Sequence, residues 1–526
     1  MKIIKYIFTI FSIVLIIYAG YVITQKNAQQ EEIAQNETQE EVVQELKPIR
    51  IGICSLDTIN PLKTQNKEVM NVSKLIFEPL LLIKEDNSIE YGLAKEFSKT
   101  SDVTYVIKLK ENRKWQDGTV VVAKDVQFTI DRLKENTSVY SANVQEISSV
   151  EVLDSTTVKI TLAKSVPFFE YRLEFPILCS HQYENENFQE STQMPLGTGM
   201  YKIEKQEGNS ITLQKHTYYP NYENISTQEV KIFQYASMGE VFNSFKMGNI
   251  DVITTNNVNL QDYIGSMGYS SKEMKGRDYD FLSFNCEDTL LGRKEVRQAV
   301  SYAIDRGSIV SEIYGNSMVV AGFPLDYGNF LYQEQEASAG YNPDQAKKVL
   351  EEAGWSYKYN RWQKKEGYST LKLDITITVD ETNQGRLQTA EFIKTQLEEI
   401  GIKVTIQKVT NEKYNTLLQE RNYQIILTGI QNGISPEISY FFGEGNVANY
   451  QNNDALQAVK DAEKTIMDPE ALKKSYTKIL ELYNKEVPFL GLYRNKQVLV
   501  TSQSVSGEIE PTFYTSYFHF ETWKNS

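Results

Sequence analysis

The residue types that most often carry out catalysis or bind metals are scarce in this sequence. Its 526 residues include only 3 histidines and 3 cysteines. They are widely spaced along the chain: Cys54, Cys179, His181, His216, Cys286 and His519. No CxxC, HExxH or GxSxG element is present, although zinc sites and nucleophilic enzymes need such groups at fixed spacing. The sequence therefore predicts no enzyme, no metal site and no cofactor.

Two short motifs look functional but favour structural roles. In KWQDGT, Asp117 and Gly118 suit a tight turn, and Trp115 can pack into a core. In GTGMY, Gly197 and Gly199 resemble half of a dinucleotide-binding fingerprint. A strand is expected after this motif instead of a helix, so no helix N-terminus is offered to a phosphate. We interpret both motifs as turns.

Charge and composition exclude several classes of protein. Lys and Arg number 55 and Asp and Glu 69, a net charge of −14, and such an acidic chain repels nucleic acid. The 41% hydrophobic and 24% charged residues are typical of soluble globular proteins, not of polytopic membrane or mostly disordered ones. A chain of this length is expected to form at least two hydrophobic cores.

The first 48 residues differ from the rest. Lys2 and Lys5 precede an uncharged, mostly apolar run, 6–25, that is just long enough to span a membrane. The lipobox-like IYAG is followed by Tyr21 and not by cysteine, so a peptide anchor is expected instead of a lipid one. We predict a signal sequence or membrane anchor over 1–25 and a flexible, acidic stalk over 26–48. An uncleaved anchor is favoured, and a cleaved signal peptide is the alternative.

The body of the chain alternates between strands and helices. Alternating apolar residues predict strands over 373–379 and 402–406, and helical spacing predicts a helix over 384–400 between them. A further apolar strand is expected over 423–429. Strand, helix and strand in this order indicate a βαβ unit, which requires a covered parallel sheet. The segments VTYVIKLK, TTVKITLA and NSITLQK indicate an additional β-rich section.

Two further helices carry recognisable boundaries. In NPDQAKKVLEEAGW, Asn342 is the expected cap and Pro343 the first helical residue. RKEVRQAVSYAIDR is amphipathic as well, and Asp305 near its end is expected to pack or to cap. The early and late parts together predict an α/β protein with at least two lobes.

Several segments, taken in order, resemble a known family. They are INPL, LIFEPLL, YGLAKEFS, YVIKLKENRKWQDGTVVVAKDVQFTIDRL, PLGTGMYKIEKQ, MGEVFNSFKMGNIDVI, FLSFNC, RKEVRQAVSYAIDRGSIV, YNPDQAKKVLEEAGW and VPFLGLYRNKQVLV. Their order and spacing resemble the family 5 solute-binding proteins, the extracellular receptors of oligopeptide, dipeptide and nickel ABC importers. The resemblance extends from about Arg50 to the C-terminus.

The resemblance implies a two-lobed fold like that of type II periplasmic binding proteins, preceded here by an N-terminal transmembrane helix. Lobe I would comprise 49–276 and the returning segment 485–526, with an extra β-rich subdomain at 82–184. Lobe II would be 277–484. The chain would cross between them near 279–284 and 487–493, and the lobes would close around the ligand.

The implied function is extracytoplasmic capture of a peptide or peptide-like solute and its delivery to an ABC permease and ATPase complex. The protein would act as a monomer at the outer face of the cytoplasmic membrane, held there by residues 6–25 or released if they are cleaved. A ligand-sensing receptor of the same fold is one alternative. A binder of a non-peptide ligand such as a metal chelate is another.

One departure from the family concerns how a peptide's amino terminus would be held. Peptide binders of the family place an Asp just after the strand that here reads IILTG, and this carboxylate pairs with the charged amine. This chain continues with Ile430, Gln431 and Asn432, which are neutral. We therefore predict that a ligand without a free amine is tolerated.

The remaining candidates for ligand contact come from the resemblance. They are polar residues near the crossings and aromatic residues after the IILTG strand or near the hinge. The predicted ligand-binding set is Asn60, Asn285, Gln431, Asn432, Tyr440, Tyr450 and Tyr493.

Overall fold

The computed structural model describes residues 17–26, 46–332, 340–465 and 467–526. Residues 17–26 are helical. Within the described ranges, no helix combines the length and the apolar character needed to cross a bilayer. The rest of the predicted anchor and most of the predicted stalk, residues 1–16 and 27–45, lie outside the described residues. A separate compact body spans Pro48–Asn525.

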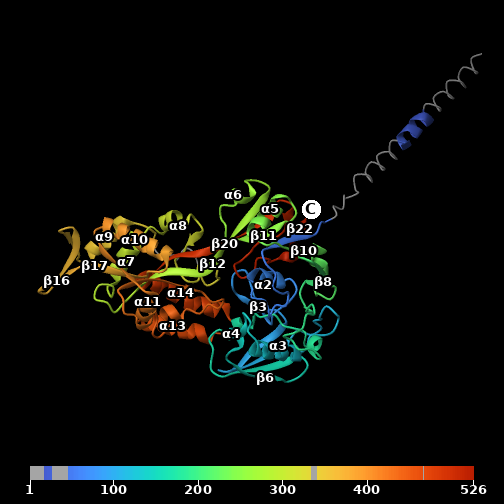
Figure 1. The fold of residues 1–526 in the computed structure, drawn as a ribbon, viewed down its shortest axis with the longest axis horizontal. Coiled ribbons are helices and arrows are strands. Elements are labelled where there is room, and N and C mark those ends of the chain that lie inside the picture. Colours follow the sequence, from blue (N-terminus) through green and yellow to red (C-terminus); the bar gives the residue numbers. More distant parts are fainter. Residues whose placement is uncertain (1–16, 27–45, 333–339, 466) are drawn as a thin grey trace, which may run out of the picture. The chain divides into compact units, whose positions relative to one another are not determined.

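One large sheet runs through the body (Figure 1), with strands in the order β18-β17-β19-β12-β20-β11-β1-β10-β9-β8 and β13 paired to β20. The strands are β1 (Ile49–Ile53), β8 (Tyr201–Glu207), β9 (Ser210–Lys215), β10 (Glu229–Gln234), β11 (Val252–Thr255), β12 (Tyr269–Phe284), β13 (Met318–Val320), β17 (Asp374–Asp380), β18 (Lys403–Val409), β19 (Ile425–Gln431) and β20 (Phe489–Ser502). The two longest, β12 with 16 residues and β20 with 14, pair antiparallel in the middle of this sheet.

The predicted βαβ unit is confirmed. Strands β17 and β18 are parallel, and α10 (Gln384–Glu399) connects them. The helix begins where the side chain of Asn383 accepts a hydrogen bond from the Arg386 amide at 3.0 Å. It ends before Gly401, whose φ of +88° suits a residue without a Cβ.

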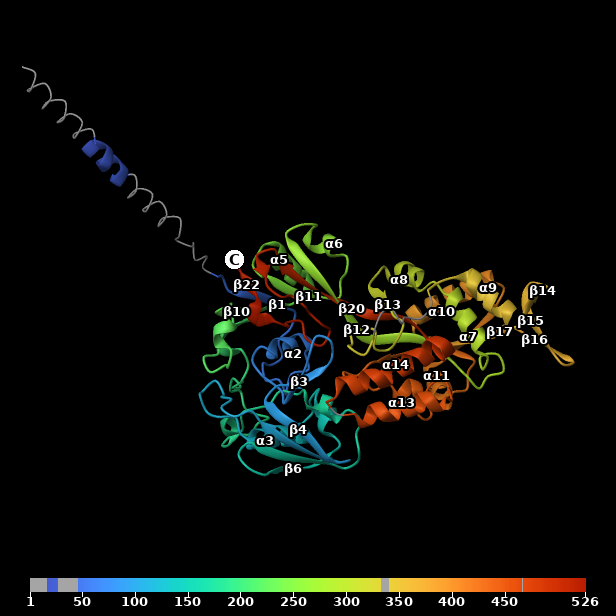
Figure 2. The same cartoon turned by 180° about the vertical axis from the view of Figure 1, so that it is seen from behind.

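Helices lie on both sides of this part of the sheet. In Figures 1 and 2, α8 and α10 are on one side of β12 and β20, and α13 and α14 are on the other. The helices of the body, besides α10, are α2 (Lys67–Ser73), α3 (Ala123–Glu135), α4 (Ser141–Val144), α5 (Met238–Lys246), α6 (Leu260–Ile264), α7 (Lys294–Ala303), α8 (Arg306–Tyr314), α9 (Pro343–Glu352), α11 (Asn411–Glu420), α12 (Ser439–Phe442), α13 (Asn453–Lys464) and α14 (Pro469–Glu486).

Local capping explains where two of these helices start. The predicted cap of α9 is confirmed, because Asn342 accepts a hydrogen bond from the Gln345 amide at 2.9 Å and Pro343 is the first helical residue. Asp305 caps the helix that follows it, α8, by accepting from the Ser308 amide at 3.1 Å.

A smaller antiparallel sheet, with the order β4-β5-β7-β6, forms the β-rich section. Its strands are β4 (Ala94–Ser101), β5 (Thr104–Leu109), β6 (Ile147–Val152) and β7 (Thr157–Leu162). Short strands pair elsewhere: β2 (Leu81–Ile83) with β3 (Ile89–Tyr91), β14 (Ser356–Lys358) with β15 (Arg361–Glu366) and β16 (Ser369–Lys372), and β21 (Val505–Ser506) with β22 (Lys524–Asn525).

The two motifs interpreted as structural do have structural roles. Trp115 is fully buried, and its indole nitrogen donates to the buried Asp125 carboxylate at 3.2 Å. Gly197 and Gly199 pack against the backbone of Ile76 so closely that a Cβ on Gly197 would lie 2.0 Å from the Ile76 carbonyl oxygen.

Separate hydrophobic cores form on the two sides of the large sheet's centre. The first core draws on residues between 49 and 274 and again between 499 and 523, whereas the second draws on residues between 282 and 493. Strand β12 gives Met274 to the first core and Leu282 to the second, and β20 likewise gives Leu499 and Leu490. A third core joins α12, α13 and α14 to the loop around Leu325.

Candidate functional site

A cavity of about 410 Å³, here called the cleft cavity, lies where segments of the different cores face one another. Its lining residues come from five segments: 85–87, after β2; 273–275 and Arg277, on β12; Tyr327 and Gly328; Ile434, after β19; and 510–514, near the C-terminus. The amide of Phe330 donates to the carbonyl of Asp86 at 2.8 Å, which joins two of these sides beside the cavity.

Arg277 reaches the cleft cavity from an irregularity in β12. The pairing of β12 with β20 is regular up to Lys275 and shifts register before Tyr279, and such bulges redirect side chains. Gly276 is required here, because a Cβ on it would lie 1.8 Å from the Asn495 side-chain oxygen. The Nε of Arg277 is buried without a hydrogen-bond partner, and no ion pair joins its guanidinium to another described residue.

Two lysines of one helix face approach the same region. Lys67 begins α2 and Lys74 follows its end, and a separation of seven residues puts both on one side of the helix. The Lys67 ammonium lies 3.1 Å from the ring centre of Phe513 and donates to the Gln497 side chain at 2.8 Å. The Lys74 ammonium lies 3.1 Å from the ring centre of Tyr514 and donates to that residue's carbonyl at 2.7 Å.

The electrostatics of these three cations reflect burial and mutual repulsion. Burial, followed by the charge of Arg277, lowers the pKa of Lys67 to about 7, although Asp278 acts in the opposite direction. Burial also lowers the pKa of Lys74, with Arg277 and Lys67 adding to the effect. Glu174 is the carboxylate that faces Lys74. It is buried and accepts a hydrogen bond from the Tyr514 hydroxyl, and its burial raises its pKa.

The carboxylates at the rim of the cleft cavity are compensated differently. Exposed Glu273 pairs with Lys496 at 2.7 Å, and exposed Glu510 pairs with Lys272 at 3.5 Å. Asp86 accepts hydrogen bonds from the amide and hydroxyl of Ser88 at 2.9 and 2.6 Å. These three carboxylates therefore have partners within the protein. Glu85 and the cations Lys275 and Arg277 also line the cleft cavity, whereas Lys67 and Lys74 do not.

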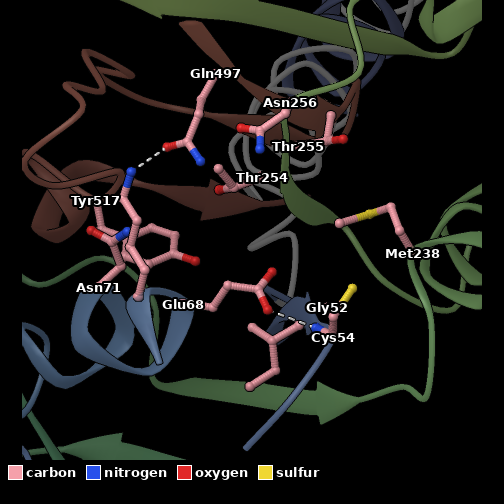
Figure 3. Close-up of a pocket in the computed structure, with 12 residues that line it drawn as sticks. Gly52, Cys54, Glu68, Asn71, Met238, Thr254, Thr255, Asn256, Gln497 and Tyr517 are labelled. Carbon is pink, nitrogen blue, oxygen red and sulfur yellow. Dashed lines mark hydrogen bonds between the residues drawn. The ribbon is translucent and has the colours of Figure 1, made fainter. Parts of the chain in front are cut away.

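A second cavity, of about 220 Å³, is lined by Lys67, Glu68 and Gln497, among others (Figure 3). It lies at the carboxyl ends of the parallel strands β1 and β11, where open α/β sheets commonly bind ligands. The Glu68 carboxylate lies beside Cys54 and accepts a hydrogen bond from its amide at 2.8 Å. Burial raises the pKa of the Cys54 thiol to about 11, so the thiol is neutral near pH 7.

A third cavity, of about 520 Å³, is lined by Lys74, Glu174 and Tyr514, among others. Tyr514 lines the cleft cavity too. Lys67 lines the second cavity and Lys74 the third, and neither lines the cleft cavity.

Comparison with sequence families gives a match over residues 88–451, which is more than half of the chain. The matching family is described as bacterial extracellular solute-binding proteins, family 5. The chain belongs to this family.

The curated relatives of this solute-binding protein are also binding proteins. A putative ABC transporter peptide-binding protein of Brucella ovis is 26% identical over 380 residues, covering 68% of this chain and 69% of the relative. The oligopeptide-binding protein AppA of Bacillus subtilis is 23% identical over 478 residues, covering 85% and 86%. The family binds solutes and is not enzymatic.

The solved structures establish the fold. The nickel ABC transporter protein of Bacillus halodurans superposes with a TM-score of 0.76 at 20% identity, covering 91% of this chain and 100% of that one. The body is thus a mixed α/β fold of the periplasmic-binding-protein type.

Cys179, His181 and Asp117 form a cluster that resembles the catalytic residues of a cysteine protease. The Cys179 sulfur lies 3.0 Å from His181 Nδ1, and His181 Nε2 lies 2.7 Å from an Asp117 oxygen. Cys179 is fully buried, and burial raises the pKa of its thiol to about 12. A reactive cysteine needs a lowered pKa and access to substrate, so this cluster is structural in a solute-binding protein.

Two of the residues predicted to contact ligand lie beside the cleft cavity. The backbone amide of Asn432 donates to the carbonyl of Arg277 at 2.9 Å, and its side chain donates to the carbonyl of Pro324 at 2.6 Å. Gln431 donates to the Asp278 carboxylate at 3.0 Å. Both residues support the Arg277 segment, and neither lines the described cavities.

The other predicted contact residues lie apart from one another. Asn60 is buried and donates weakly to the Tyr183 hydroxyl at 3.4 Å, and Asn285 is hydrogen-bonded to the Arg421 carbonyl and to Asn449. Tyr440 is 40% exposed, whereas Tyr450 and Tyr493 are buried. The Tyr493 hydroxyl accepts a hydrogen bond from Tyr314 at 2.6 Å. Their roles in ligand contact stay predictions.

Sequence reasoning missed the residues that do line the cleft cavity. Arg277, Tyr327, Phe513 and Tyr514 line it. One signal was available: the aromatic run TFYTSYFHF near the C-terminus, which contains Phe513 and Tyr514.

Proposed function

We propose that the protein is the substrate-binding component of an ABC importer and captures a peptide or peptide-like solute in the cleft cavity. The observation that carries this proposal is the cavity itself, which is lined by segments from both sides of the central strands. Membership of the family and the names of the relatives support it. Binding sites at the meeting point of two sides of a fold are common because closure then buries most of the ligand.

The proposed motion follows from how the chain is threaded. We propose lobe I as 49–276 with 485–526, lobe II as 277–484, and an extra subdomain over 82–184. The contribution of β12 and of β20 to both the first and the second core supports this division, because two continuous strands can act as a hinge. Closure would bring Tyr327 and Ile434 toward Phe513 and Tyr514 around the solute.

We propose further that residues 6–25 hold the protein at the outer face of the membrane. The uncharged run after Lys2 and Lys5, and Tyr21 at the position of a lipid-bearing cysteine, support a peptide anchor. The mass of the mature protein's N-terminus tests this proposal. An intact N-terminus in the membrane fraction supports an uncleaved anchor, and a start beyond residue 25 contradicts it.

The binding function is tested with the full chain purified in mild detergent. We expect native mass spectrometry to detect one bound peptide per chain after incubation with a tryptic digest of casein, and we expect the digest to raise the melting temperature. A protein that neither retains nor is stabilised by any peptide would contradict peptide capture. Permease and ATPase genes beside this gene would support import, and a kinase gene there would support sensing.

A further inference from the structure

The small antiparallel sheet β14-β15-β16 has one face against the body and one face in solvent. The register of its strands determines which side chains share a face, because paired residues point to the same side. On one side, Trp362 is buried in the second core, and its indole nitrogen donates to the Ile400 carbonyl at 2.8 Å. On the same side, Glu366 pairs with Arg293 at 2.8 Å. This face therefore attaches the sheet to the body.

The opposite face, here called the cationic face, carries positive charge without acidic neighbours in the sheet. Its residues are Ser356, Lys358, Arg361, Gln363, Lys365, Thr370 and Lys372. Arg361 pairs with Asp374 of β17 at 3.3 Å. Lys358, Lys365 and Lys372 are exposed and have no ion pair among the described residues. The one acidic residue of 356–372 is Glu366, which lies on the other face. In a chain with a net charge of −14, this face is a local excess of positive charge.

Two tyrosines lie in the turns at opposite ends of this sheet. Tyr359 is 91% exposed and Tyr368 is fully exposed. Tyr359 and Asn360 form the two-residue turn between β14 and β15, with φ values of +54° and +58°. Such a turn favours Asn and Gly, and a bulky ring is unfavourable in this backbone conformation. Local stability therefore does not explain Tyr359, whereas an amphipathic ring suits the boundary between water and lipid headgroups.

The position of the sheet leaves the cationic face accessible. Figures 1 and 2 show β16 at the edge of the body, beyond α9 and β17 and on the side away from β22. Residues 356–372 line none of the described cavities. The cationic face can therefore meet an extended surface without covering the cleft cavity.

We propose that the cationic face docks the body onto an anionic lipid surface, with its lysines against the phosphate groups and the turn tyrosines among the headgroups. Clusters of Lys and Arg bind anionic lipids because each charge near the surface adds to the attraction. An acidic protein would match the lysines equally well, but the tyrosines at both turns favour a bilayer boundary. The proposal goes beyond solute capture and rests on the proposed location at the membrane. With an anchor at residues 6–25, it gives the body a second point of attachment.

The first test offers the full chain two kinds of nanodisc, one of phosphatidylcholine alone and one with a third of its lipid as phosphatidylglycerol. A membrane anchor would insert into either kind, so the comparison isolates the charge of the lipid. We expect hydrogen exchange of the backbone amides of 356–372, read by mass spectrometry, to slow severalfold with the anionic nanodiscs alone. A salt concentration of about 0.5 M should remove this protection, because salt screens exposed charges.

Three results of this test would overturn the proposal. One is equal exchange with both kinds of nanodisc. Another is protection by soluble polyglutamate without protection by anionic lipid, which would assign the cationic face to an acidic protein. The third is protection that grows with protein concentration in the absence of lipid, which would assign the face to a second copy of this chain.

The second test changes the protein. We expect the triple variant Lys358→Gln, Lys365→Gln and Lys372→Gln to lose the protection by anionic nanodiscs. The matched control carries Lys246→Gln, Lys413→Gln and Lys474→Gln, and it should keep the protection. It removes the same charge from exposed lysines of α5, α11 and α14 that have no ion pair among the described residues. Protection that persists in the folded triple variant would overturn the proposal.

A change at one turn separates lipid contact from stability. Tyr359→Asn should raise the melting temperature, because Asn tolerates the left-handed backbone, and it should reduce the protection by anionic nanodiscs. Full protection in this variant would overturn the placing of Tyr359 among the headgroups. Solute capture, read by native mass spectrometry, should be unchanged in all these variants, so a failure to bind solute in every one of them, the unaltered chain included, would contradict the proposed function and leave the lipid contact standing.

Discussion

Two arginines at the centre of the large sheet lie in opposite environments. Arg494, on β20, is fully buried and donates to the carbonyls of Gly276, Phe323 and Pro324. It also pairs with Asp326 and lies 5.1 Å from the ring centre of Tyr279. Arg277, on the neighbouring strand, is half-buried and has neither a hydrogen bond nor an ion pair with its guanidinium among the described residues.

The difference separates a buried charge whose partners belong to the protein from a half-buried one that lines the cleft cavity. Arg494 joins the loop of Phe323 and Asp326 to the two crossing strands, so its partners are all part of the protein. Arg277 lies two positions before Tyr279, which pairs with Arg494 across the two strands, and its guanidinium has no such partners among the described residues. A fully buried charge needs partners within the protein, whereas a half-buried one can still be solvated.

The largest expected effect comes from replacing Arg494, the arginine whose partners belong to the protein. Arg494→Met should lower the free energy of unfolding by about 3–5 kcal/mol, because it leaves the Asp326 carboxylate and several carbonyls without their partner. Urea denaturation measures the change. Arg361→Met, which breaks the exposed pair with Asp374, should cost less than about 1 kcal/mol. Equal effects of the two substitutions would contradict the structural role of Arg494.

A smaller effect is expected from replacing Gly276, which precedes Arg277 in the bulge of β12. In Gly276→Ala the new Cβ would overlap the Asn495 side chain, which also holds Asp278, so we expect a loss of about 1–3 kcal/mol and weaker solute binding. Gly239→Ala in α5, where the nearest atom is 3.7 Å away, should instead be neutral or stabilising. Thermal unfolding compares the two, and an unaffected Gly276→Ala would show that the bulge tolerates a side chain.

The pH dependence of stability sharpens the electrostatic side of the comparison. Burial, followed by the charge of Arg277, lowers the pKa of Lys67 to about 7 in the folded protein, below the ordinary value of a lysine. Between these two values the unfolded chain binds the proton and the folded protein does not, so the free energy of unfolding should increase as pH rises from about 7 toward about 10. Arg277, Asp278, Lys74 and Glu174 face the same space.

Urea denaturation at several pH values between about 7 and about 10 checks this dependence. Lys67→Met should flatten the profile, and an unaltered profile in that variant would assign the titration to another group.

The smallest expected effect concerns the amino terminus of a bound peptide. Since Ile430, Gln431 and Asn432 provide no carboxylate for an ammonium, N-acetylation of a bound peptide should change its affinity less than about threefold. Titration of the paired free and acetylated peptides measures this ratio. A strong preference for the free amine would show that another carboxylate, such as exposed Glu437, takes the missing role.

Local patterns in the sequence predicted much of the fold because they act over a few residues. Alternating and helical periodicities located β17, α10 and β18, and Asn342 with Pro343 located the start of α9. The structural interpretation of Trp115 held for the same reason, since a tryptophan next to an Asp-Gly turn packs locally. The family resemblance followed from many such segments in a fixed order.

The candidate site could not be predicted from such local patterns. Its lining includes residues 85–87 and Arg277, and two of its rings come from 513 and 514, more than 200 residues further along. No local pattern marks such a set. Of the residues predicted near the IILTG strand, Asn432 donates from its side chain to the Pro324 carbonyl and from its backbone amide to the Arg277 carbonyl, and its contact with ligand stays a prediction.

By itself, the sequence determined the family, the α/β class, the scarcity of catalytic residues and the neutral character of the loop after β19. These properties depend on residue types, periodicity and order. Only the tertiary structure decided that Arg494 pairs with Asp326 whereas Arg277 forms no ion pair among the described residues, because the partners of a charge are fixed by which distant strands and loops surround it. Burial then converts that difference into energy, since an unpaired charge is tolerable in water and costly beside a protein core.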